Sequence, residues 1–427
     1  MSAPLSDILC INYYFPPLNS PAVIRNYKIA STFCDHFDQV HVLSSDNFKR
    51  FPQFKRSIPK NLNIHSVPTL DYRLVIANRS KKEKKKGVHL TMNKKSNPIY
   101  QYLLRVQKSF PFNLILAEGN LYYILNAYSQ AKKLIKNGKI NTIYTSFGPY
   151  ADHYVGYLLK RKYPDLKWIA DFRDLQIEPI YKNVIWKGIQ QKMEKKVLAK
   201  ANLVTTISEG FVDQLLQYNR PTISVLRGVD VRPIIQQFQK FTIAYTGSMY
   251  FDYRDPSALF IEIKKLLAEK LIDNSDIQLI YAGRDSDKYT KYINSYQLQE
   301  IYQNKGLVSS SDAKNIQSRA HINLLLTSSS SELTGVLTGK IFEYFEAQNP
   351  NLCLINGVKD SEIESIFSEL NAGSVVYSPS ITKGKMRQFI LAKYKEWKTT
   401  NKVVPTINIP VLMKKYSWEN QVVKMLG

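Results

Sequence analysis

The sequence predicts an α/β protein built from two doubly wound domains, and three features support this prediction. The chain has 427 residues, which exceeds the size at which one hydrophobic core usually divides in two. Short β-rich apolar runs alternate with longer helical segments, a pattern typical of parallel sheets covered by helices. The alternation pauses once, in a polar stretch near the middle of the chain. We therefore expect one parallel sheet on each side of that pause.

The expected strands fall into two groups, one before the pause and one after it. They are Ile8–Phe15, Val40–Ser45, Ile140–Phe147, Trp168–Phe172 and Leu203–Ile207, followed by Phe241–Gly247, Ile277–Gly283, Ile322–Thr327 and Leu352–Asn356. The pause lies between Leu226 and Phe241, so we place the first domain at 1–230 and the second at 238–405. The last stretch, Tyr416–Leu426, has the pattern of an amphipathic helix.

Composition and charge narrow the class of protein. Lysine and arginine number 59 against 35 acidic residues, a net charge of +24, which favours nucleic acid, an anionic membrane face or phosphorylated substrates as partners. Cys10, Cys34 and Cys353 lie in apolar stretches and are expected to be core residues in a reducing compartment. The start of the chain has no signal-peptide pattern, and no apolar run is long enough to span a bilayer. We therefore expect a cytoplasmic protein.

Three clusters in the first domain follow expected strands, where doubly wound sheets bind their ligands. The loop Asn12–Ala22, which contains Asn19 and Ser20, precedes a helix N-terminus suited to a phosphate or sugar. His153 lies in the first helical turn after Thr145, where the helix dipole favours the neutral imidazole that a base or sugar-binding group requires. The alternative for the loop is an ordinary rigid turn, and the alternative for His153 is a histidine that only packs.

The third cluster ends the strand at Trp168–Phe172. It delivers Asp171, Arg173 and Asp174 within four residues, and Asp171 and Arg173 are expected on one side of an extended segment. Such groups bind sugar hydroxyls in a cleft, whereas on a surface they form only an ion-pair cluster. We nominate His153 and Asp171 as catalytic residues.

The second domain holds the more specific pattern. In Glu332–Pro350 a glycine-rich turn leads into a helix from about Thr338, where Gly339 and Lys340 are placed to bind a diphosphate. Glu343 lies on the same helical face as Lys340 and can accept hydrogen bonds from ribose hydroxyls. The alternative is a surface Lys–Glu pair. Gly247 and Arg254, which follow the first strand of this domain, are further candidates for phosphate binding.

In their order and spacing, these motifs resemble the GT-B glycosyltransferases, in particular bacterial enzymes similar to glycosyltransferase family 4. The resemblance covers nearly the whole chain, through NYYFPP, TSFGPYADH, ADFRDL, VLRGVD, YTGS and LTGKIFEYFEAQNP. It implies two Rossmann-like domains facing a cleft, with a C-terminal helix from about 410 to 427 that crosses back to the first. It also implies a nucleotide-sugar donor on the second domain, a glycan or lipid-linked acceptor on the first, and retention of anomeric configuration. Cell-surface polysaccharide synthesis is the expected role.

Within this resemblance, Glu343 matches the second glutamate of the family's paired motif, which holds the nucleotide ribose. The position of the first glutamate is occupied by Gly335, and this difference leaves a non-catalytic sugar-nucleotide-binding subunit as an alternative. No DxD metal motif stands out, so we expect no metal and no cofactor beyond the donor. A nucleic-acid-binding protein is the remaining alternative, but the lysine run is not interleaved with aromatic residues.

A basic stretch interrupts the pattern of the first domain. Arg79, Lys81, Lys82, Lys84, Lys85, Lys86, Lys94 and Lys95 lie within 17 residues. We expect this loop to make a peripheral contact with an anionic membrane at the inner face of the plasma membrane. The alternative is a solvated loop that only aids solubility.

Overall fold

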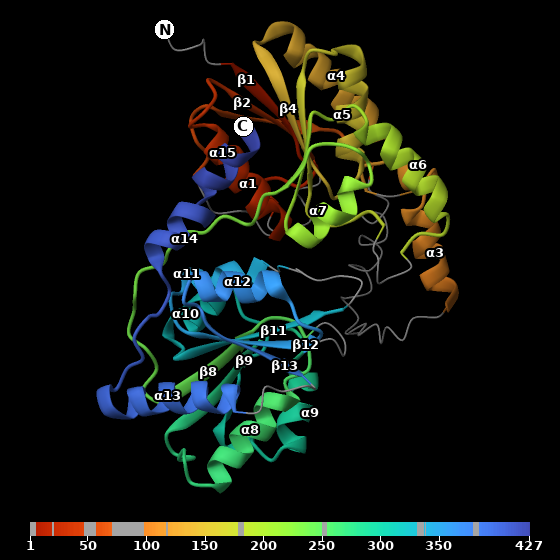
Figure 1. Cartoon of the computed structure of the whole chain (residues 1–427). Helices are drawn as coiled ribbons and strands as arrows, with labels where there is room; N and C mark the ends of the chain where they lie inside the picture. The colour runs from red at the N-terminus through yellow and green to blue at the C-terminus, as the bar shows by residue number, and fades with distance from the viewer. Residues whose placement is uncertain are drawn as a thin grey trace, which may run out of the picture. The chain divides into compact units, whose positions relative to one another are not determined.

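The computed structural model describes residues 6–18, 21–46, 57–70, 98–116, 118–177, 183–249, 254–330, 337, 339–378 and 384–427. The chain divides into two compact units, each with its own parallel sheet (Figure 1). Unit 1 comprises Met1–Leu226 together with Gln421–Gly427, and unit 2 comprises Arg227–Asn420. The two doubly wound domains predicted from the sequence are thus confirmed.

The sheet of unit 1 has the strand order β3-β2-β1-β4-β5-β6-β7. Its strands are β1 (Asp7–Ile11), β2 (Val40–Ser45), β3 (Leu62–Val67), β4 (Ile140–Ser146), β5 (Lys167–Phe172), β6 (Leu203–Thr206) and β7 (Thr222–Ser224). The helices of this part are α1 (Pro21–Phe33), α3 (Pro98–Lys108), η2 (Phe112–Leu114), α4 (Leu121–Asn137), α5 (Ala151–Lys162), α6 (Lys187–Leu198) and α7 (Glu209–Leu216). The switch in strand order lies between β1 and β4, the position at which such sheets bind ligands.

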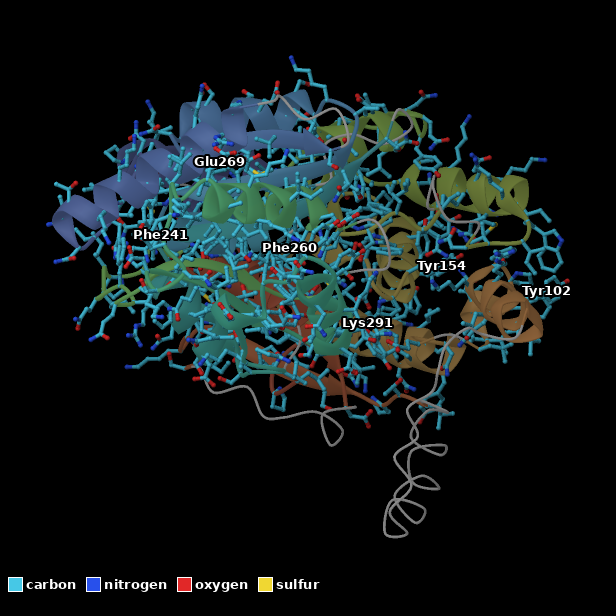
Figure 2. The ribbon with its side chains drawn as sticks, turned by 90° about the horizontal axis from the view of Figure 1, so that it is seen from below. Tyr102, Tyr154, Phe241, Phe260, Glu269 and Lys291 are labelled. Atoms are coloured by element: carbon cyan, nitrogen blue, oxygen red, sulfur yellow. The ribbon has the colours of Figure 1, made fainter. Side chains whose placement is uncertain are left out.

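The sheet of unit 2 has the order β10-β9-β8-β11-β12-β13. Its strands are β8 (Phe241–Thr246), β9 (Ile277–Ala282), β10 (Tyr302–Asn304), β11 (Ile322–Ser329), β12 (Asn351–Gly357) and β13 (Gly373–Ser378). Its helices are α8 (Ser257–Ala268), α9 (Ser286–Ser295), η4 (Gln299–Ile301), α10 (Ser310–Arg319), α11 (Gly339–Glu346), α12 (Ser361–Glu369), α13 (Lys385–Thr400) and α14 (Ile409–Tyr416). Phe241 on β8 and Phe260 on α8, both labelled in Figure 2, belong to the main core of this unit.

The C-terminal segment forms two helices instead of the single helix expected from the sequence. Ser417 adopts an extended conformation between α14 and α15 (Trp418–Leu426) and forms an isolated bridge with Val229. The end of α15 packs in unit 1, where Lys424 Nζ donates to Ser224 O at 2.7 Å and Lys167 Nζ donates to Leu426 O at 2.6 Å. This is the return of the C-terminus that the resemblance implied. No helix among the described residues is long and apolar enough to cross a membrane.

Candidate functional site

The loop that follows β8 is fixed in place by its neighbours in unit 2. Gly247 has φ of 138°, a conformation that favours glycine. Tyr281 Oη donates to Gly247 O at 2.9 Å, and Tyr245 Oη donates to Ser248 O at 2.7 Å. Asp285, just after β9, accepts a hydrogen bond from the Met249 amide at 2.8 Å. The carboxyl ends of β8 and β9 therefore present one ordered backbone surface.

Lys340, in the first turn of α11, lies against that surface. A Cβ atom added to Gly247 would be 1.1 Å from Lys340 Nζ, so the side chain occupies the space that glycine leaves. The ammonium lies 5.2 Å from the centre of the Tyr245 ring and is buried, and it has no hydrogen-bond partner among the described residues. Burial, assisted by the Arg254 guanidinium and opposed by Glu343, lowers the pKa of Lys340 to about 7. A buried amine without a hydrogen-bond partner is costly to charge.

Arg254 adds a second cation beside Lys340. Its Nη1 donates to Ser248 O at 3.0 Å, which holds the guanidinium at the same loop. After β9, Asp285 raises the pKa of Lys340 and Arg284 lowers it. The structure therefore brings together Gly247, Arg254 and Lys340, three of the residues that the sequence nominates for phosphate binding.

Helix α11 is anchored so that Lys340 and Glu343 keep their positions. Tyr344 Oη accepts the Thr246 amide at 3.1 Å, which ties the helix to the end of β8. The buried Glu346 forms ion pairs with Arg227 at 3.0 Å and Arg232 at 3.1 Å. These contacts make α11 a rigid support.

Glu343 remains partly exposed on this helix, with 32% of its side chain accessible. Arg227 Nη2 lies 3.9 Å from Glu343 Oε1, and Gly339 packs loosely against Arg227, with a Cβ there 3.4 Å from Arg227 Cδ. An accessible carboxylate held by an arginine is suited to accept hydrogen bonds from a vicinal diol. Unit 2 therefore offers two cations for a diphosphate and a carboxylate for a ribose.

In unit 1, Asp171 lies at the centre of a buried network. Its carboxylate accepts hydrogen bonds from Arg25 Nη2 at 3.0 Å, Tyr144 Oη at 2.9 Å and Thr205 Oγ1 at 2.8 Å, and it is 0% exposed. Burial alone would raise the pKa of Asp171, but Arg25 and these hydrogen bonds together lower it. The contacts do not fit the catalytic role predicted for Asp171. We assign this carboxylate to positioning, because Arg25 in turn donates to Val225 O at 3.0 Å.

His153 is fully buried near the start of α5. Its Nδ1 lies 2.7 Å from Thr145 Oγ1, which also accepts a hydrogen bond from Trp168 Nε1 at 2.9 Å. Burial lowers the pKa of His153 to about 3, so the ring is neutral at pH 7. The other nitrogen, Nε2, has no hydrogen-bond partner among the described residues. A buried ring nitrogen of this kind calls for a partner such as a water or a ligand group.

Arg173, which was expected on the same side of the chain as Asp171, does not join the hydrogen bonds of the Asp171 carboxylate. Arg173 turns to the loop after β4, where its Nε donates to Phe147 O at 2.9 Å and its Nη2 donates to Gly148 O at 3.2 Å. Asp174 is exposed. Both line a cavity of about 790 Å³ together with Tyr150 and other residues of α3 and α5.

Two further polar side chains at the ends of β1 and β4 are buried without hydrogen-bond partners in the described part of the chain. They are Asn12, which is 0% exposed, and Ser146 Oγ. Because Ile11 pairs with Thr145 in the sheet, Asn12 and Ser146 follow at the same level. Such unpaired buried groups call for a water or ligand. Asn19, Ser20 and Gly335 lie outside the described residues.

Sequence reasoning missed the residues that support the site. Arg232 and Glu346 are more than a hundred positions apart, and no local pattern predicts their ion pair. Asp152 was also missed, although its buried carboxylate accepts the Tyr13 amide at 2.8 Å and so fixes the loop after β1. The one local feature that could have indicated the ion pairs of Glu346 is its place as the second glutamate of the sequence FEYFE. Among the described residues, no cluster of three or more His, Cys, Asp or Glu side chains is placed to hold a metal.

Comparison with known proteins identifies the fold. No protein-family model matches the sequence, and no curated protein sequence matches it. A sucrose-phosphate synthase from Thermosynechococcus elongatus superposes with a TM-score of 0.58 at 10% identity, covering 98% of this chain and 97% of that chain. The lipopolysaccharide outer core galactosyltransferase WaaB gives 0.56 at 11% identity, covering 98% and 99%.

A third solved structure contains ligands. A mutant of S. aureus TarM in complex with fondaparinux, alpha-GlcNAc-glycerol and UDP gives a TM-score of 0.56 at 11% identity, covering 99% of both chains. At these identities the likeness concerns the fold alone. This chain has the two-domain GT-B fold.

Proposed function

We propose that the protein is a glycosyltransferase that takes a sugar from a nucleotide-sugar donor bound on unit 2. The proposal rests on Lys340 in the first turn of α11. Its amine is buried against Gly247 and beside Arg254, and it has no hydrogen-bond partner in the described residues. A diphosphate supplies the negative charge and the acceptor oxygens that this group lacks. The fold shared with WaaB and TarM supports the same conclusion.

Each residue of the site has a role in this proposal. Lys340 and Arg254 neutralise the diphosphate, and their charge matters most when the bond between the anomeric carbon and the diphosphate oxygen breaks. Glu343 accepts hydrogen bonds from the ribose. The acceptor hydroxyl oxygen forms the new bond to the anomeric carbon, and its proton leaves with the nucleoside diphosphate or to water. We further propose retention of configuration and a place in cell-surface polysaccharide synthesis.

The acceptor is proposed to bind on unit 1. The cavity of about 790 Å³ has aromatic walls, including Phe147 and Tyr150, and polar groups such as Arg173 and Asp174. Aromatic faces with polar side chains at their edges suit a glycan. His153 is proposed to reach a sugar hydroxyl through Nε2.

A contact with an anionic membrane is also proposed, because a lipid-linked acceptor is presented there. The basic loop from Arg79 to Lys95, on which the sequence-based expectation depends, lies outside the described residues.

Two variants test the donor site. Lys340→Ala and Glu343→Ala are each expected to weaken nucleotide-sugar binding about tenfold to a hundredfold, because each loses one charge-assisted contact of about 1.5–3 kcal/mol. Lys395→Ala, an exposed lysine on α13, is the matched control. Titration calorimetry with UDP-glucose, UDP-N-acetylglucosamine and GDP-mannose measures the affinities. Unchanged affinity in both variants would contradict the site, and binding without transfer to any glycan acceptor would favour a non-catalytic subunit.

A further inference from the structure

One face of unit 1 exposes large apolar side chains that no other described part of the chain covers. These residues lie on α3, on the segment that follows it, and at the start of α6. They are Tyr102, Leu103, Ile115, Leu116, Trp186 and Ile189, with exposed fractions between 41% for Trp186 and 59% for Ile115. We call this surface the α3–α6 face. Clustered exposed apolar residues of this size indicate an interaction site.

The three segments form one continuous surface. The rings of Phe112 and Trp186 lie 6.0 Å apart, and the Phe110 amide donates to Gln190 Oε1 at 3.0 Å. Gln107 Nε2 donates to Leu116 O at 2.8 Å, which folds the segment after α3 back onto the helix. Figure 1 shows α3 next to α6, and Figure 2 shows Tyr102 on the outer side of its helix.

The exposed charges of α3 and α6 on this face are basic, and the nearby Glu118 is partly buried. Exposed basic residues of α3 and α6 flank the apolar ones: Arg105, Lys108, Lys187, Lys192, Lys195 and Lys196. Within the described ranges 98–116 and 183–198 the one acidic residue is Glu194, which is 2% exposed and hydrogen-bonded by Tyr218 Oη. The face therefore combines apolar and aromatic groups with uncompensated positive charge.

This combination fits a lipid surface better than a second copy of the chain. A two-fold pairing of copies would place the same lysines against one another. An anionic bilayer offers acyl chains to the apolar side chains, and its headgroups attract lysines whose stems lie along the apolar surface. Tryptophan and tyrosine are also enriched at membrane interfaces.

We propose that the α3–α6 face docks on an anionic lipid surface, with Trp186 and Ile189 among the residues that enter the interface. This proposal rests on the proposed function, because it identifies the surface that would make the proposed membrane contact. Leu103 and Lys108 belong to α3 and also line the cavity of about 790 Å³. Docking therefore brings that cavity to the lipid surface, where the sugar of a lipid-linked acceptor is presented.

Trp186 provides a direct readout in the intact chain. Of the four tryptophans, Trp168, Trp397 and Trp418 are at most 7% exposed, whereas Trp186 is 41% exposed. Fluorescence is measured with vesicles of phosphatidylcholine alone and with phosphatidylglycerol added. We expect a blue shift and quenching by brominated acyl chains only with the anionic vesicles. Raising salt from about 0.1 M to 1 M shortens the Debye length from about 10 Å to about 3 Å and should release the protein.

Paired variants complete the test. Ile189→Ser combined with Leu116→Ser should weaken binding to anionic vesicles at least about tenfold, because both apolar groups would leave the interface. The control combines Ile234→Ser and Leu307→Ser, which are 68% and 80% exposed in unit 2 and should change nothing. Equal binding to both vesicle types, no loss in the first pair, or an equal loss in the control would overturn the proposal.

Sedimentation velocity without vesicles tests whether a second copy of the chain binds the α3–α6 face instead. A dimer that the first pair disrupts, together with no vesicle binding, would assign the face to a second copy. No nucleotide sugar enters these measurements, so the docking proposal and the donor site can fail separately.

Discussion

Substituting Lys340 gives the sharpest prediction about the donor site, because its charge is coupled to pH. Burial and, to a smaller extent, the Arg254 guanidinium lower the pKa of this amine to about 7. A bound diphosphate favours the charged form and raises the pKa again. Binding should therefore be accompanied by proton uptake above pH 7, and Lys340→Met should abolish that uptake.

The magnitude follows from the protonated fraction of Lys340 in the empty site. With a pKa of about 7, that fraction falls about 25-fold between pH 6.5 and pH 8.5, which corresponds to ~2 kcal/mol of binding free energy. The phosphates of a nucleotide sugar are diesters and lose no proton in this range. The sign is that affinity falls as pH rises.

Titration calorimetry in buffers of different ionisation enthalpy measures both affinity and proton uptake. We expect about half a proton to be taken up per nucleotide sugar at pH 7, and none by Lys340→Met, whose weaker affinity should not vary with pH. Lys395→Met, on the exposed side of α13, should behave as the wild type. An affinity independent of pH in the wild type, or a pH dependence retained in Lys340→Met, would refute the reasoning.

Three other predictions concern positions that the structure assigns to geometry or stability. Gly247→Ala would place a Cβ 1.1 Å from Lys340 Nζ and should reduce nucleotide-sugar affinity at least about tenfold. The control is Gly384→Ala, with φ of 105° and no neighbour within 4 Å, which should cost only about 1–3 kcal/mol of stability. Equal nucleotide-sugar affinities of Gly247→Ala and the wild type by calorimetry would contradict the contact. Asp171→Asn should destabilise the protein by about 3–5 kcal/mol in urea unfolding, because it leaves the buried Arg25 guanidinium without its counter-charge. A variant as stable as the wild type would contradict the positioning role of Asp171. The pKa of Glu194 is raised by burial from 4.5 to about 7, so the native state binds the proton more tightly than the unfolded chain does. Stability should fall as pH rises through that window, by on the order of 3 kcal/mol relative to Glu194→Gln, and parallel urea-unfolding profiles for the two proteins would refute it.

The sequence predicted the interior of both sheets but not their edges. Every expected strand is present, and the strands that were missed are β3, β7, β10 and β13, the outermost strands of the two sheets. Interior parallel strands are buried on both faces and appear as continuous apolar runs. The edge strand β10, Tyr302–Asn304, is short and mostly polar and has no such signal.

The candidate site was predictable where local pattern determines position. The glycine turn after β8 and the start of α11 were both predicted from local pattern. Gly247 and Lys340 meet because parallel strands deliver their carboxyl ends to the same edge of a sheet. Asp171 could not be judged in this way. Its burial depends on Arg25, which lies 146 positions away in the sequence, and only the folded chain shows that pairing.

The central claim is that unit 2 binds a nucleotide sugar through Lys340 and Glu343. The most direct measurement is saturation-transfer NMR of the full chain with a panel of UDP-, GDP-, dTDP- and CMP-linked sugars, repeated with Lys340→Met. At least one of these sugars should show transfer to its ribose protons, and Lys340→Met should greatly reduce this transfer. No transfer from any member of the panel, or equal transfer in wild type and variant, would contradict the central claim.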